Sequence, residues 1–304
     1  MQSINFRTDM ADERVDKYKE VHNLSRIDGI KVESIKKENM CITTVDILNE
    51  NGSIALGKDI GKDITIEFNE LEYCSDDVKQ NMIKELAEQI KILIGNKTSI
   101  IVVGLGNKDV TPDALGPKVV GNINVTRHML KYAKEFVEPN TKEISALSPG
   151  VLGTTGIETE EIVESVINSI KPNIAIVIDS LASLSVKRVG KTIQLSNTGI
   201  TPGAGIGNER KGLNKETLGI PVIAIGVPTV VDLGTIIDEG LDIFISKLQE
   251  KAESNEYLNK LKEQDNYEEI KEALATPNDY NMIVTPKEID ELIENMKDVI
   301  AKRN

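Results

Sequence analysis

Residues 99–118 read SIIVVGLGNKDVTPDALGPK and place an apolar run directly before a glycine-rich turn. A short apolar run of this kind is typical of a strand buried in a parallel sheet. The same order returns downstream, where a helix predicted over 158–170 precedes the apolar run IAIVI (174–178). A further run, PVIAI (221–225), ends at Gly226. This alternation predicts an α/β fold with a doubly wound, mostly parallel sheet and helices on both faces.

The segment before this core carries a different pattern. Two β-branched runs, MCITTVDIL (40–48) and DITIEF (63–68), alternate in the manner of strands. Asn51-Gly52 lies between them and is a turn signal. We therefore predict an N-terminal β insertion over residues 40–70, which joins the parallel core through a helix ending near residue 94.

The last part of the chain is strongly charged and favours helix. Residues 245–304 are predicted to form a helical tail, in which TPKE (285–288) has the pattern of a capping box. Apolar residues then recur at helical spacing from Ile289 to Ile300, which predicts that this helix packs on the body of the protein. Because no clean linker interrupts the chain, we expect residues 10–304 to form a single α/β domain.

Composition excludes several classes of function. The 304 residues carry 36 Lys and Arg against 49 Asp and Glu, a net charge of −13, which argues against direct nucleic-acid binding. Two cysteines are too few for a secreted disulfide framework. No apolar run approaches the roughly 20 residues that a membrane span needs. A cytoplasmic protein without a membrane partner is expected.

Carboxylates are the natural candidates for catalysis in this chain. Only two histidines occur, and neither an HExxH zinc motif nor a GxSxG nucleophile elbow is present. The GLGN turn holds only two of the three glycines of a dinucleotide fingerprint, so a tight strand-to-helix turn is the preferred interpretation. We predict neither a metal nor a cofactor.

Two aspartates follow buried strands. Asp113 lies after the first apolar run and Asp179 directly after the second, so both are expected at the edge of the sheet where sites form. Taken singly, Asp113 has the alternative role of a helix N-cap, and Asp179 of a cap or loop anchor. Taken together, two converging carboxyl groups can share one proton, and so activate water while protonating a leaving group.

The ordered motifs resemble those of the germination protease family. The stretches that carry the resemblance are RTDMADE (7–13), GLGN with TPDALGP (104–117), SPGVLGTTGIET (148–159), IDSLAS (178–183) and SNTGITPGAGIGNERK (196–211). The resemblance implies a fold related to hydrogenase maturation endopeptidases, a homotetramer, and an endopeptidase that degrades small acid-soluble spore proteins in the spore core. It also implies that Asp113 and Asp179 are the catalytic pair, since they lie in matching motifs.

The resemblance is compatible with both metal-dependent and aspartic-type catalysis. The family has been classed both as metallopeptidase and as aspartic-type peptidase. Related maturation enzymes use a histidine after a later strand as a metal contact, whereas this chain has Gly226, Val227 and Pro228 there. An aspartic-type mechanism without metal is therefore favoured. The alternatives are a hydrogenase-maturation-like endopeptidase, which would be expected to be shorter and to need that histidine, and a non-catalytic spore binding protein.

The N-terminus repeats the pattern expected of the substrate. The resemblance implies a zymogen with a short propeptide and cleavage after an acidic residue, before an apolar residue followed by Ala. Residues Asp9 to Glu13 have this pattern, so we predict a propeptide over residues 1–9 and self-cleavage between Asp9 and Met10, favoured by mild acid. An exposed, mobile terminus would make this bond accessible. The alternative is that Asp9 is simply the N-cap of a helix.

An acidic substrate needs positive side chains beside the cleft. Arg127, Arg188 and Arg210 lie near the two glycine-rich stretches and are the candidates for binding it, because charge-assisted contacts to carboxylates are strong. For each of them the alternative is an ordinary solvated surface residue.

Overall fold

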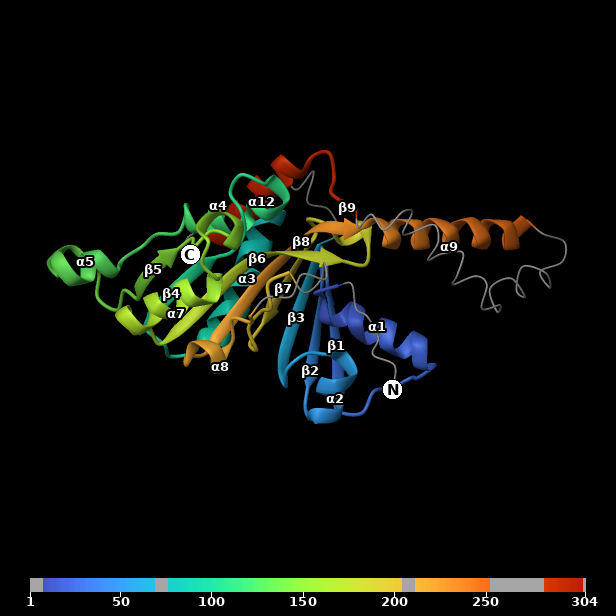
Figure 1. The fold of residues 1–304 in the computed structure, drawn as a ribbon, viewed down its shortest axis with the longest axis horizontal. Helices are drawn as coiled ribbons and strands as arrows, with labels where there is room; N and C mark the ends of the chain where they lie inside the picture. Colours follow the sequence, from blue (N-terminus) through green and yellow to red (C-terminus); the bar gives the residue numbers. More distant parts are fainter. Residues whose placement is uncertain (1–7, 69–75, 204–210, 252–281, 303–304) are drawn as a thin grey trace.

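A single twisted sheet organises the molecule (Figure 1). The computed structural model describes residues 8–68, 76–203, 211–251 and 282–302. The sheet has nine strands in the order β1-β2-β3-β7-β8-β6-β4-β5, with β9 paired to β8. The strands are β1 (Ile30–Lys37), β2 (Met40–Ile47), β3 (Gly61–Phe68), β4 (Ser99–Gly104), β5 (Glu143–Leu147), β6 (Ile174–Ser183), β7 (Thr192–Ser196), β8 (Val222–Asp232) and β9 (Ile283–Val284).

Helices cover both faces of this sheet (Figure 1). The α-helices of the described residues are α1 (Ala11–His22), α2 (Glu50–Leu56), α3 (Asp76–Ile94), α4 (Leu115–Val120), α5 (Arg127–Tyr132), α6 (Leu152–Thr155), α7 (Thr159–Ile170), α8 (Lys215–Leu218), α9 (Leu233–Lys251) and α12 (Ile289–Ala301). Short 3-10 turns are η1 (Thr111–Asp113), η2 (Lys134–Phe136) and η3 (Val186–Arg188). None of these helices is long and apolar enough to cross a bilayer.

The predicted parallel core is confirmed. Strands β5, β4, β6 and β8 run parallel, and they contain the apolar runs recognised in the sequence. Side chains on one face of the sheet pack with α3, α4 and α12, whereas those on the other face pack with α7 and α8. Because β4, β6 and β8 are covered on both faces, their backbone polar groups and apolar side chains are removed from water together, whereas the edge strand β5 is half-buried.

The N-terminal strands extend the same sheet. Strands β1, β2 and β3 pair antiparallel in sequence order, and β7 joins β3 to the parallel core. The turn expected at Asn51-Gly52 is instead part of helix α2. The side chain of Asn49 accepts a hydrogen bond from the Gly52 backbone N–H at 3.0 Å, and Gly57 ends the helix in the left-handed conformation. Both positions are common helix caps.

The C-terminal helix belongs to the core. Helix α12 begins at Ile289, and the expected capping box does not form, because Thr285 Oγ1 donates to the Thr229 carbonyl of β8 at 2.9 Å. The predicted apolar stripe is confirmed, since Ile293 and Met296 are fully buried in the cluster that also contains the central strands. Residues at the end of the chain thus complete the hydrophobic core.

Truncating this helix's buried face should destabilise the whole domain. We predict that Met296→Ala lowers the free energy of unfolding by about 2–5 kcal/mol, because the cavity adds to the lost burial. Chemical denaturation measures the change. The matched control is Glu291→Ala, an exposed position of the same helix, which should change stability by less than about 0.5 kcal/mol. Equal effects of the two substitutions would show that α12 is peripheral.

Candidate active site

Asp113 is held at the end of a tight turn that follows β4. Gly106 has φ +108°, and a Cβ there would lie only 2.0 Å from the Asp113 carbonyl oxygen. The backbone N–H of Asn107 donates to Asp113 Oδ2 at 2.7 Å. Helix α4 has Ala114 at its N-cap position, so Asp113 does not cap it. The glycines of the GLGN motif therefore serve a turn that aims this carboxyl group.

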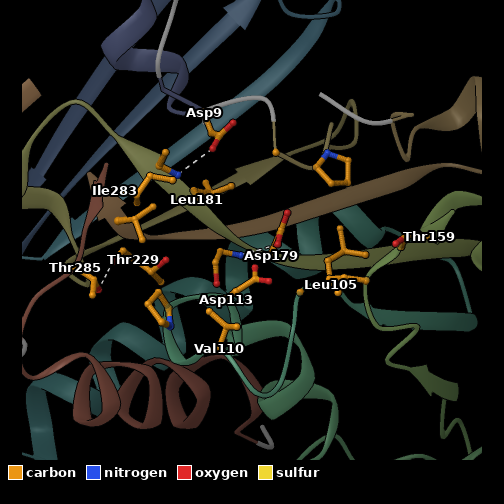
Figure 2. Close-up of a pocket in the computed structure, with 18 of the residues that line it drawn as sticks. Asp9, Leu105, Val110, Asp113, Thr159, Asp179, Leu181, Thr229, Ile283 and Thr285 are labelled. Carbon is orange, nitrogen blue, oxygen red and sulfur yellow. Dashed lines mark hydrogen bonds between the residues drawn. The ribbon is translucent and has the colours of Figure 1, made fainter. Parts of the chain in front are cut away.

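Asp179 lies inside β6, which continues past the predicted strand end to Ser183. Its side chain is buried, with the residue only 6% exposed, and its Oδ1 accepts a hydrogen bond from the Ser180 N–H at 2.8 Å. Figure 2 shows the side chains of Asp113 and Asp179 next to one another on the wall of one cavity. The predicted convergence of these two carboxyl groups is therefore observed.

Burial disfavours ionisation of this pair. Desolvation raises the pKa of Asp179 well above its ordinary value, and the charges of Asp113 and Asp9 raise it further. Desolvation also raises the pKa of Asp113, while the hydrogen bond from Asn107 acts in the opposite direction. Two neighbouring carboxyl groups in such surroundings do not both ionise readily.

The cavity beside the pair has a volume of 480 Å³ and a mainly apolar wall. Its apolar lining comes from several separate parts of the chain and includes Leu105, Val110, Pro112, Val151, Leu152, Leu181, Val230 and Ile283. The hydroxyl oxygens of Ser180 and Thr229 are buried without a hydrogen-bond partner in the described part of the chain, and both residues border this cavity. The space can take an apolar side chain while offering hydroxyl groups to a peptide backbone.

The N-terminal segment occupies one side of the cavity. Asp9 lines it, and its carboxylate accepts a hydrogen bond from the Ala182 N–H at 2.9 Å (Figure 2). Thr8 and Met10 are both fully buried. The expectation of an exposed terminus is therefore wrong for these residues. The alternative role of Asp9 as an N-cap is also wrong, because Met10 takes the N-cap position of α1.

The three arginines do not gather at the cavity. Arg188 lies at the end of η3, where it pairs with Asp12 at 2.7 Å and reaches Glu13 at 3.6 Å. It thus holds the start of α1. Arg127 on α5 pairs with Glu143 at 3.0 Å, and neither arginine lines the cavity. Arg210 lies outside the described residues.

Neither His22 nor His128 lines the cavity. Its acidic lining residues are Asp9, Asp113 and Asp179. Within the residues that the structure describes, no three His, Cys, Asp or Glu side chains are grouped to hold an ion.

Sequence reasoning missed the contribution of the C-terminal segment to this site. Ile283 and Thr285 line the cavity because β9 pairs with the end of β8, at Val231 and Asp232. A two-residue strand leaves almost no periodic signal in the sequence, and β9 is placed by its pairing with β8.

Known proteins match this chain over most of its length. The family model of the germination protease matches residues 6–262. A germination protease of Clostridium perfringens is 43% identical over 303 residues, covering 98% of this chain and 93% of that protein. Those of Caldanaerobacter subterraneus and Bacillus cytotoxicus are 45% and 39% identical, covering 98% and 90% of this chain and 93% and 85% of their own lengths.

A structural comparison finds a nickel–iron hydrogenase maturation protease from Thermococcus kodakarensis. It has a TM-score of 0.30 and 21% identity, and the match covers 46% of this chain and 80% of the other. The assignment rests on the sequence matches, which extend from the N-terminal segment through both aspartate motifs. This chain belongs to the germination protease family.

Proposed function

We propose that this germination protease family member is an aspartic-type endopeptidase that begins the degradation of small acid-soluble spore proteins in the spore core, using Asp113 and Asp179. The observation that carries the proposal is the pair of adjacent carboxyl groups, one of them buried in a strand, on the wall of a cavity of peptide dimensions. The alternative of a non-catalytic spore binding protein gives no reason for placing two carboxyl groups together out of water.

Asp113 and Asp179 have different roles in the proposed reaction. Asp179 keeps the shared proton, since burial raises its pKa most. Asp113 is ionised more readily, because the Asn107 N–H stabilises its charge. Asp113 accepts a proton from water as the water oxygen bonds to the scissile carbonyl carbon, and Asp179 hydrogen-bonds the carbonyl oxygen. The proton then passes to the amide nitrogen as the C–N bond breaks.

We also propose that residues 1–9 are a propeptide and that the Asp9–Met10 bond is cleaved by the same pair. The support is that Asp9 already borders the cavity. Mild acid favours the reaction, because the Asp9 charge raises the pKa of Asp179 and protonation relieves the repulsion. Binding of acidic substrates by Arg127, Arg188 and Arg210 stays a prediction. Arg188 is already engaged by Asp12 and Glu13 in the full chain.

A homotetramer is the assembly we propose. Its support is exposed apolar surface on two projecting helical segments (Figure 1). Tyr132 and Phe136, at the end of α5 and in η2, are 76% and 78% exposed, and Phe244 on α9 is 60% exposed. Large exposed aromatic side chains are typical of protein–protein interfaces.

Removing either acid should abolish proteolysis. We predict that Asp113→Asn and Asp179→Asn each lower the rate of cleavage of an acid-soluble spore protein by about 10²–10⁴-fold, because general acid–base catalysis is lost. Mass spectrometry of the digest measures the rate. The control is Asp109→Asn, an exposed residue of the same loop. Wild-type rates in both variants would disprove the assignment, and activity that a chelator removes and a metal restores would disprove its aspartic type.

The raised pKa of Asp179 should make the stability of the fold depend on pH. The folded-state pKa of Asp179 is raised, so its contribution to stability is fully present at low pH and is lost as pH rises through that pKa. We therefore predict that Asp179→Asn is more stable than the wild type near neutral pH, and that the difference shrinks as pH falls. Urea unfolding across a pH series measures it. A difference that grows under acid would contradict a buried, protonated Asp179.

Self-processing has a defined product. Purified full-length protein incubated at mildly acidic pH should yield a chain beginning at Met10, more rapidly than at neutral pH. N-terminal sequencing identifies the product, and Asp113→Asn protein, free of other proteases, is the control and should stay intact. A different new terminus, or undiminished processing of the Asp113→Asn protein, would rule out self-cleavage at this bond.

A further inference from the structure

A buried glutamine hydrogen-bonds the backbone on both sides of the peptide bond that we propose is cleaved. Gln194 lies on β7 and is only 6% exposed. Its Nε2 donates to the Asp9 carbonyl oxygen at 3.0 Å, and its Oε1 accepts from the Ala11 N–H at 2.7 Å. One carboxamide therefore spans the Asp9–Met10 bond, with its donor directed at the carbonyl that would be attacked.

The other polar atoms of this peptide are also engaged. The Met10 N–H donates to Thr8 Oγ1 at 3.0 Å. Lys58 Nζ lies 3.4 Å from the Asp9 carbonyl oxygen and 3.1 Å from Asp63, a buried carboxylate. The Asp9 carbonyl thus receives a neutral donor and has a cation nearby.

Gln194 and the acid pair lie on opposite sides of this peptide. In the sheet, Asp179 pairs with Gly226, which in turn pairs with Gln194, so the three residues form one row across neighbouring strands. Asp9 and Leu181 border both the 480 Å³ cavity and a second one of 210 Å³. The acid pair lines only the first, whereas Gln194 lines only the second. Asp9 therefore separates the two groups.

We propose that Gln194 is the electrophilic residue of self-cleavage: its Nε2–H polarises the Asp9 carbonyl and stabilises the oxyanion that forms there. The inference rests on the proposed cleavage between Asp9 and Met10. As the water oxygen bonds to the Asp9 carbonyl carbon, the water proton goes to the acid pair and the C=O electron pair moves onto oxygen. Collapse of this intermediate breaks the C–N bond, the proton passes to the Met10 nitrogen, and an Asp9 carboxylate and a Met10 amine result.

Anchoring of α1 is the competing role for Gln194, and the two roles use different atoms. Anchoring depends on the acceptor for Ala11 as much as on the donor to Asp9, whereas polarisation needs only the donor. Gln194→Glu keeps the acceptor and replaces the donor by a charge that repels an oxyanion. Protonation of the introduced carboxyl group restores a donor. The charged side chains around it in the second cavity are Asp9, Arg14, Lys58 and Asp59.

The experiment follows the appearance of the chain beginning at Met10 in full-length protein, by mass spectrometry over a pH series. We expect Gln194→Met to slow self-cleavage on the order of 100-fold, as loss of an oxyanion donor does elsewhere. Gln194→Glu should be slow near neutral pH and should recover with falling pH more steeply than the wild type. Thr192→Val is the matched control, because Thr192 is fully buried on the same face of β7 and should leave the rate unchanged.

The possible results distinguish a failure of the proposed role of Gln194 from a failure of the proposed cleavage between Asp9 and Met10. Wild-type self-cleavage together with undiminished rates in Gln194→Met overturns the role of Gln194 and leaves the proposed function standing. A Gln194→Glu rate that stays low throughout the pH series also overturns it, because protonation restores a donor to the Asp9 carbonyl. Absence of a Met10 terminus in the wild type overturns both proposals.

Discussion

The burial of the Asp179 carboxyl group beside Asp113 is the constraint on which the site depends. Close contacts between backbones bring the two together: a Cβ at Gly116 would lie 2.3 Å from the Leu105 carbonyl oxygen, and one at Gly104 would lie 2.1 Å from that of Gly116. Glycines therefore let α4 and the preceding turn press against β4 and β6. The result is an acid pair with raised pKa values, formed by Asp179 of β6 and Asp113 of the η1 turn.

The N-terminal segment is fixed by polar contacts with the same strands. Arg188 forms ion pairs with Asp12 and Glu13. The Ser183 hydroxyl and the Leu184 N–H each donate a hydrogen bond to the Glu13 carboxylate at 2.8 Å. The segment is therefore held on both sides of Met10, with Asp9 on the wall of the cavity that Asp113 and Asp179 also line. In the full chain, the negative charge of Asp9 therefore opposes ionisation of Asp179.

Sequence predicted the parts of this architecture that arise from local pattern. The buried strands and the edge position of Asp113 and Asp179 follow from apolar runs that end at a turn or an acid. Strand β1 was missed because it is almost wholly exposed and owes its conformation to pairing with β2. The burial of the N-terminal segment was missed because Gln194 and Ala182, which bond Asp9 and Thr8, are more than 170 residues away in the chain.

Titration of the two carboxyl groups tests the central claim most directly. Carboxyl ¹³C NMR of full-length protein reports the pKa values of Asp113 and Asp179 when each is assigned with its Asn variant. We predict that Asp179 titrates well above an ordinary aspartate, and that its pKa falls when Asp113 is replaced by Asn. Two ordinary and independent titrations would contradict a pair that shares a proton.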